Sequence, residues 1–89
     1  MTRYRVEGDW ITVAYRFYSK GHFINIEQAD LVDSHNGQRF IGGAYRVRLG
    51  GIPEMRTKRF YGESAHSHAV TYGHDAAVKC GDWGWWPDL

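Results

Sequence analysis

The chain has little of what small proteins use for covalent or long-range electrostatic stabilisation. Its 89 residues include one cysteine, Cys80, so no intrachain disulfide can form. Small secreted domains, in contrast, usually contain several disulfides. The formal net charge of +1 gives no overall argument for a polyanionic partner. The N-terminus lacks the apolar stretch of a signal peptide, and no apolar run is long enough for a membrane span. These absences predict a protein of the cytoplasm with no membrane partner.

Patterns for catalysis and metal binding are also missing. His66, His68 and His74 fall in one predicted helix, but their spacing does not place two of them one turn apart, as chelation from a helix requires. Ser64 is explained as a helix cap and Cys80 as a small core residue, and neither has an evident general base. No glycine-rich stretch has phosphate-binding spacing. We therefore expect no enzymatic activity, no metal and no cofactor.

The composition is that of a folded globular domain. Hydrophobic residues make up 43% of the chain and aromatic residues 16%, whereas disordered chains are poor in both. A chain of this length buries roughly 60% of its unfolded surface, which is enough for one modestly stable core. We expect a single domain over residues 1–89.

Three glycine-containing turn signals divide the first half of the chain into alternating apolar runs. They are Gly8-Asp9, Lys20-Gly21 and Asn36-Gly37, and dipeptides of this kind indicate two-residue hairpin loops. An antiparallel meander follows, with strands at 3–7, 10–18, 22–32 and 39–49. A fifth strand is predicted at 55–61, after a Gly-Gly-Ile-Pro connection.

The loop lengths also predict which residues share a face of this sheet. Ile26 is expected opposite Val47 and Tyr15, and Ile24 opposite Leu49 and Phe17. Gly42 and Gly43 indicate a strong twist or the close approach of another element. The predicted apolar face comprises Tyr4, Val6, Ile11, Val13, Tyr15, Phe17, Ile24, Ile26, Val32, Ile41, Tyr45, Val47 and Leu49. A register shift of one residue would move this set to the opposite face.

The opposite face is predicted to be rich in arginine. It collects Arg3, Arg5, Arg16, Arg46 and Arg48, with Glu27 facing Arg46, and it has Trp10 at one end and Tyr18 at the other. Arginines and aromatic rings on a sheet are used by several folds to neutralise phosphate and stack bases. The alternative is that these residues only solvate a half-exposed sheet.

The last third of the chain predicts a helix and a short tail. The helix begins at Glu63 or Ser64 and ends before Gly81, with Lys79 in its last turn. Small residues predominate on one stripe, which comprises Ala65, Ala69, Tyr72, Gly73, Ala76 and Cys80. Short side chains can pack closely on bulky ones, so we expect the helix on the apolar face, in an α+β two-layer domain.

The tail, residues 82–89, carries three of the four tryptophans. Tryptophan is enriched at interface hot spots, so Trp85 and Trp86 are candidate partner-binding residues. The alternative is that the tail folds back over its own domain, since exposed indoles favour aggregation.

This layout of a short chain, a meander, one helix and an aromatic tail resembles that of small accessory proteins of bacteriophages and mobile elements, including anti-CRISPR-type inhibitors. The resemblance implies binding of a host protein in the host cytoplasm.

We therefore expect a non-enzymatic binding protein, a monomer or homodimer, that occludes or recruits a macromolecular partner, most simply a protein. The alternative is a nucleic-acid-binding module that uses the arginine face, for which affinity would fall steeply with salt. The candidate partner-binding residues are Arg3, Arg5, Arg16, Arg46, Arg48, Trp10, Tyr18, Trp85 and Trp86.

Overall fold

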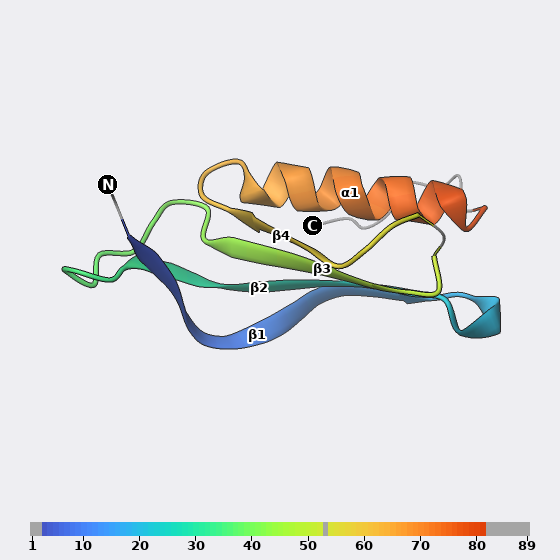
Figure 1. Ribbon diagram of the computed structural model, residues 1–89, viewed down its shortest axis with the longest axis horizontal. Helices are drawn as coiled ribbons and strands as arrows, with labels where there is room; N and C mark the ends of the chain where they lie inside the picture. The colour runs from blue at the N-terminus through green and yellow to red at the C-terminus, as the bar shows by residue number, and fades with distance from the viewer. Residues whose placement is uncertain (1–2, 53, 82–89) are drawn as a thin grey trace.

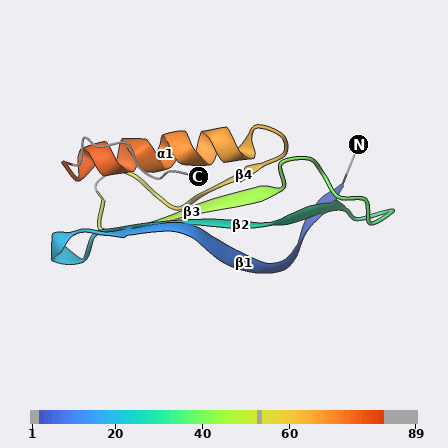
Figure 2. The same ribbon diagram turned by 180° about the vertical axis from the view of Figure 1, so that it is seen from behind.

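The computed structural model describes residues 3–52 and 54–81, which form an antiparallel sheet with one helix lying along it (Figure 1). The strands are β1 (Tyr4–Phe17), β2 (Phe23–Asp33), β3 (Ala44–Gly50) and β4 (Lys58–Tyr61), and they lie in the order β1-β2-β3-β4. A short 3₁₀ helix, η1 (Ser19–Gly21), joins β1 to β2, and α1 (Ala65–Lys79) follows β4. The view from behind shows the same two layers (Figure 2). The predicted α+β class and two-layer arrangement are confirmed.

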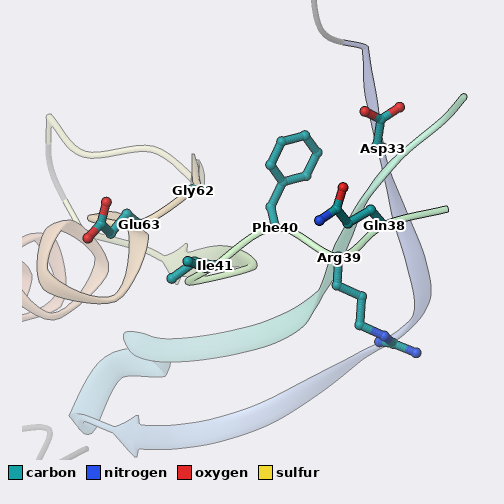
Figure 3. A pocket seen from close by; sticks show the side chains of 7 residues that line it. All are labelled: Asp33, Gln38, Arg39, Phe40, Ile41, Gly62 and Glu63. Atoms are coloured by element: carbon teal, nitrogen blue, oxygen red, sulfur yellow. The ribbon is translucent and has the colours of Figure 1, made fainter. Parts of the chain in front are cut away.

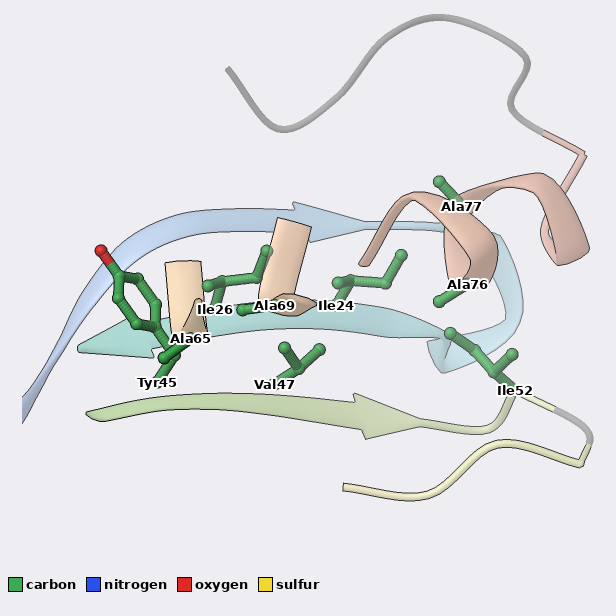
Figure 4. Close-up of a cluster of buried hydrophobic side chains, with 9 residues drawn as sticks. All are labelled: Ile24, Ile26, Tyr45, Val47, Ile52, Ala65, Ala69, Ala76 and Ala77. Atoms are coloured by element: carbon green, nitrogen blue, oxygen red, sulfur yellow. The ribbon is translucent and has the colours of Figure 1, made fainter. Parts of the chain in front are cut away.

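The core lies between α1 and one face of the sheet (Figure 4). Ile24, Ile26 and Val47 have no exposed surface, and four alanines of α1 pack over them. These alanines are Ala65, Ala69, Ala76 and Ala77. Their small size lets the helix approach the bulky side chains of the sheet closely, as the sequence predicted.

The predicted helix stripe is confirmed at Ala65, Ala69, Gly73 and Ala76, which are buried. Val70 and Ala77 are also buried, while Tyr72 and Cys80 are only partly buried against the core. Ser64 is the N-cap residue, but its side chain makes no capping hydrogen bond. The helix stops as expected before Gly81, which adopts a φ of 88° and donates its N–H to the carbonyl of Val78.

The predicted hairpin at Gly8-Asp9 is wrong, because β1 continues through both residues. Val6 pairs with Leu31 and Ile11 pairs with Gln28, and the irregularity that Gly8 permits with its φ of 79° lies between them. A hairpin would have left the last four residues of β2, 30–33, without a partner on this side. The continuous strand instead gives nearly the whole of β2 a partner, so the sheet has four strands.

The connection at Lys20-Gly21 is longer than predicted, and this changes the face of the β1 residues that precede it. The N–H of Tyr18 donates to the carbonyl of His22 at 2.7 Å, so the loop is the three-residue η1 and not a two-residue turn. Phe17 therefore pairs with Phe23, and Tyr15 with Asn25. Tyr15 and Phe17, predicted in the core, are 54% and 64% exposed on the other face.

The predicted register between β2 and β3 is confirmed. Ile26 lies opposite Val47 and Ile24 opposite Leu49. The turn after β2 is wider than predicted, with Val32 bridged to Arg39 and not to Ile41.

The strand after this turn starts at Ala44 and not at residue 39, because Gly42 and Gly43 have positive φ and interrupt it. The close approach predicted here is confirmed, since a Cβ on Gly42 would lie 2.0 Å from the carbonyl oxygen of Gly62. The fifth predicted strand is present as β4 but covers only 58–61.

Several residues predicted on the buried apolar face are exposed. They are Tyr4, Ile11, Val13, Tyr15, Phe17 and Ile41. All but Ile41 belong to β1. The predicted register of this strand was derived from the Gly8-Asp9 and Lys20-Gly21 loops, and both of these loops were predicted incorrectly. The described residues contain no helix with the length and apolar character that a membrane crossing requires.

Candidate functional site

The sheet face turned away from α1 carries the residues with the most recognisable binding chemistry. The register places Tyr15, Asn25 and Arg48 in one row across β1, β2 and β3. The next row contains Thr12, Glu27, Arg46 and Arg59. We call this surface the open face and define it by Trp10, Tyr15, Phe17, Phe23, Asn25, Glu27, Arg46, Arg48 and Arg59.

Glu27 is a buried acid at the centre of the open face, with 7% of its side chain exposed. Its Oε1 lies 2.5 Å from Nε of Arg46, which confirms the predicted pairing of these two residues. Its Oε2 lies 3.7 Å from Nη1 of Arg48 and accepts a hydrogen bond from Nδ2 of Asn25 at 3.3 Å. A buried carboxylate with three such partners is compensated for its loss of hydration. Glu27 therefore orients Arg46 and offsets part of the positive charge of the face.

Trp10 is partly covered by two arginines of the neighbouring strands. The guanidinium carbon of Arg46 lies 4.6 Å from the centroid of the Trp10 ring, and that of Arg59 lies 5.7 Å from it. Both distances are within the range of cation–π attraction. Trp10 therefore holds Arg46 and Arg59 side by side over the sheet. The Glu27 carboxylate holds Arg46 from a second direction.

Aromatic rings form the other half of the open face. Tyr15 and Phe23 stack with centroids 6.3 Å apart, and Phe17 pairs with Phe23 across the strands. Gly50 follows Phe23 in this row, and a Cβ there would lie 2.1 Å from Cε1 of Phe23. The absence of a side chain at Gly50 thus lets the Phe23 ring lie across β3. The result is an exposed aromatic patch next to Arg48.

Only some of the predicted site residues lie on the open face. Arg46, Arg48 and Trp10 are there as predicted. Arg16 is not, because it lies opposite Ile24 on the helix side of the sheet.

Arg5 and Arg3 are also placed elsewhere. Arg5 lies opposite Val32, on the helix side by strand alternation, and it pairs with Glu7 at 3.7 Å. Arg3 precedes β1, where its carbonyl accepts the N–H of Ser34. Tyr18 packs against the core and takes no part in the face. Trp85 and Trp86 lie outside the described residues.

Sequence reasoning missed Tyr15, Phe17 and Arg59. The first two were assigned to the core through the wrong loop length at η1. Arg59 could have been found, because it lies within the strand predicted at 55–61. Pairing that strand with the preceding one places Arg59 opposite Arg46.

A separate pocket of about 410 Å³ lies near the end of β2 and is lined by Asp33, Gln38, Arg39, Phe40, Ile41, Gly62 and Glu63 (Figure 3). Two of its charged groups, Asp33 and Arg39, are occupied by structural contacts. The Asp33 carboxylate accepts the N–H of His35 at 2.8 Å, and the side chain of Arg39 points away from Phe40 and pairs with Asp30. Among the described residues, no three histidine, cysteine or acidic side chains gather as a set of metal ligands.

Comparison with family models, with curated proteins and with solved structures gave no match. The functional assignment therefore rests on the geometry of the open face.

Proposed function

We propose that this protein is a non-enzymatic binding protein that occludes or recruits a protein partner through its open face. The observation that carries the proposal is the exposed aromatic patch of Tyr15 and Phe17, which stands beside arginines whose charge is partly offset by the buried Glu27.

The aromatic patch has the composition of an interface core. Tyrosine, phenylalanine, tryptophan and arginine are enriched where proteins bind one another, and a few such residues supply most of the binding energy. Phe17 is 64% exposed, so most of its ring does not contribute to the core of its own domain. Burial of these rings by a partner would gain the hydrophobic free energy that folding of this chain leaves unused.

The electrostatics of the open face favour a protein over a polyanion. Arg46 is bound to Glu27 and covers Trp10, and Arg48 lies 3.7 Å from the same carboxylate. A phosphate chain would have to compete with an acid that is already buried between these arginines. The resemblance in layout to small bacteriophage accessory proteins supports a cytoplasmic host protein as the partner.

A nucleic-acid function is the second candidate, and the stacked rings are the observation that favours it. Tyr15, Phe17 and Phe23 adjoin Arg48 on an open sheet, and single-stranded nucleic acids bind such surfaces by stacking bases on aromatic rings. The two functions differ in their salt dependence, because only the second releases counterions from phosphates.

Retention of a partner from a bacterial lysate tests the proposal. The variant carries Tyr15→Thr with Phe17→Thr, since threonine is well accommodated in strands and removes both rings. Ile41→Thr is the matched control, because Ile41 is 78% exposed and lies outside the open face. We expect the parent and the control to retain a protein at low and high salt, and the double variant to lose it. Equal retention by all three would exclude the open face as the binding surface.

Nuclease treatment and the tail variant separate the alternatives. Loss of the retained material after nuclease treatment, with a steep decline in added salt, would assign the face to nucleic acid. Trp85→Ala with Trp86→Ala tests the predicted role of the tail. Loss of retention in that variant with an unchanged melting temperature would place binding in the tail instead.

A further inference from the structure

The open face carries more positive charge than its own acid balances, since Arg46, Arg48 and Arg59 share this surface with one carboxylate, that of Glu27. Arg46 is bound to this carboxylate, and its side chain is only 20% exposed. Nη1 of Arg48 lies 3.7 Å from Oε2 of Glu27, and the Arg48 side chain is 49% exposed. Arg59 is exposed and pairs with no acidic side chain among residues 3–52 and 54–81. Arg48 and Arg59 are therefore available to an acid of another molecule.

Arg48 and Arg59 are also diagonal neighbours on the sheet. Arg59 pairs with Arg46 across β4 and β3, and Arg48 lies two residues further along β3. Diagonal neighbours in an antiparallel sheet are about 7 to 8 Å apart, which long side chains can span. In the described part of the chain, the pairing of β3 with β4 ends at Val47 and Lys58, so Arg48 has no strand neighbour on this side. One carboxylate can therefore reach both guanidinium groups, and such charge-assisted hydrogen bonds are strong.

The two ends of the sheet differ in how far this side is covered. At the end away from η1, Tyr4 of β1 and Tyr61 of β4 have ring centroids 5.0 Å apart, although β2 and β3 lie between their strands. Leu31, which lies on this side of β2 by strand alternation, is buried there. At the η1 end, Tyr15 and Phe17 are more than half exposed. A ligand bound at the arginines therefore has the accessible aromatic patch on its η1 side.

The aromatic patch begins one row of the sheet away from Arg48. Gly50 lies two residues after Arg48 on β3, and a Cβ there would meet the ring of Phe23 at 2.1 Å, so this ring lies against Gly50. Two residues of a strand span about 7 Å, and side chains on the same side of an extended segment have the same spacing. An extended ligand with a carboxylate at Arg48 can thus place the side chain two residues away on Phe23, beside Tyr15 and Phe17.

We propose that the protein partner presents an extended segment in which an aspartate or glutamate lies two residues from a large apolar residue, in either direction along the chain. The carboxylate binds Arg48 and Arg59, and the apolar side chain packs on the patch of Tyr15, Phe17 and Phe23. This inference rests on the proposed function and names the chemistry that the open face recognises. The small excess of positive charge supplies specificity for the acid, and burial of the apolar side chain supplies hydrophobic free energy.

Selection from a random peptide library displayed on phage tests this preference, with the full chain immobilised. We expect enrichment of peptides that carry an acid two residues from a large aliphatic or aromatic residue. Selection on Arg48→Gln with Arg59→Gln, the arginine variant, should keep the apolar residue and lose the acid. Lys58→Gln with Lys79→Gln is the matched control. It removes two exposed charges outside the open face, since Lys58 lies opposite Val47 and Lys79 ends α1, and it should select the same peptides as the parent.

Fluorescence anisotropy of the enriched peptide measures the contribution of its acid. Replacement of that acid in the peptide by the corresponding amide should weaken binding to the parent by about tenfold and leave binding to the arginine variant nearly unchanged. Because the protein is unaltered in the first comparison, the result does not depend on the folding of a variant. No enrichment, enrichment without an acid or with another spacing, or equal affinity of the acid and amide peptides for the parent would overturn the proposal.

Retention from the lysate distinguishes failure of this inference from failure of the proposed function. Tyr15→Thr with Phe17→Thr removes the rings, and the arginine variant removes the two charges that the acid would bind. If the ring variant loses the partner while the arginine variant retains it as strongly as the parent, the open face binds a protein without an acid, and this inference alone is wrong. If both variants retain the partner, the open face is not the binding surface, and both proposals are wrong.

Discussion

The two faces of the sheet are built from the same strands, yet they contribute to different properties of the molecule. On the helix side, Ile24, Ile26 and Val47 are completely buried under the alanines of α1. On the open face, Tyr15 and Phe17 are more than half exposed, and the buried group is an acid, Glu27. The comparison indicates that stability resides mainly on the helix side and binding mainly on the open face. It follows that substitutions on the two sides should separate these properties.

The largest expected effect is that of Ile26→Ala. Loss of this fully buried side chain should lower the free energy of unfolding by about 2 to 5 kcal/mol, because a cavity would remain between β2 and α1. Phe17→Ala removes a larger side chain from the open face and should cost less than about 1 kcal/mol, since the ring is 64% exposed. Denaturant midpoints measure both changes. Equal losses would contradict the distinction between the faces.

A second test concerns the close packing of α1. Gly73 is buried on the helix, so Gly73→Leu should destabilise the protein by about 1 to 3 kcal/mol through overpacking. Intrinsic helix propensity acts in the opposite direction, because leucine is a better helix former than glycine by nearly 1 kcal/mol. Ser67→Leu, at an exposed position of the same helix, is the control and should leave the melting temperature unchanged or slightly raised. A rise with Gly73→Leu would mean that another side of α1 contacts the sheet.

Glu27, the buried acid of the open face, should also contribute to the stability of the protein. Glu27→Gln keeps the size of the side chain but removes the charge that Arg46 binds, so we expect a loss of about 1 to 2 kcal/mol. Arg46 retains some solvent exposure, which limits the cost of leaving it unpaired. In a double-mutant cycle, Glu27→Gln with Arg46→Gln should cost less than the sum of the single changes. Additive costs would show that the pair is not coupled.

The smallest expected effect is a dependence on alkaline pH from the helix side. Burial raises the pKa of the Tyr45 hydroxyl, so the folded state favours the neutral phenol. Its contribution to stability is complete below the ordinary tyrosine pKa of about 10 and is lost as the pH rises through the raised value. Melting temperatures across this range should therefore decline less in Tyr45→Phe than in the parent. An identical decline would assign the effect to other groups.

The sequence by itself determined the elements whose signals are local or strongly periodic. The pairing of Ile26 with Val47 was predicted by counting residues from the Asn36-Gly37 turn, and a slip by one residue would have moved the apolar set to the opposite face. The turn is wider than predicted, but the irregularity at Gly42 and Gly43 compensates for it, so the predicted pairing is found. The helix and most of its buried stripe followed from small residues at helical spacing, with Gly81 as the stop signal. The pairing of Glu27 with Arg46 followed from the same register. These predictions needed only neighbouring residues and the repeat of each element.

Tertiary structure decided what the loops alone left undetermined. Gly8 is compatible with a turn or with an irregularity inside a strand, and pairing of β1 with the long β2 selected the second. The three-residue loop at η1 shifted the register by one residue, which moved Tyr15 and Phe17 from the expected core to the open face and Arg16 to the helix side. The number of residues in a loop decides which face of the sheet each following side chain occupies. That number depends on contacts between residues that are distant in sequence. Most helices and strands of this protein could therefore be predicted from its sequence. Which side chains β1 exposes depends on the pairing of the strands, and only the tertiary structure shows that pairing.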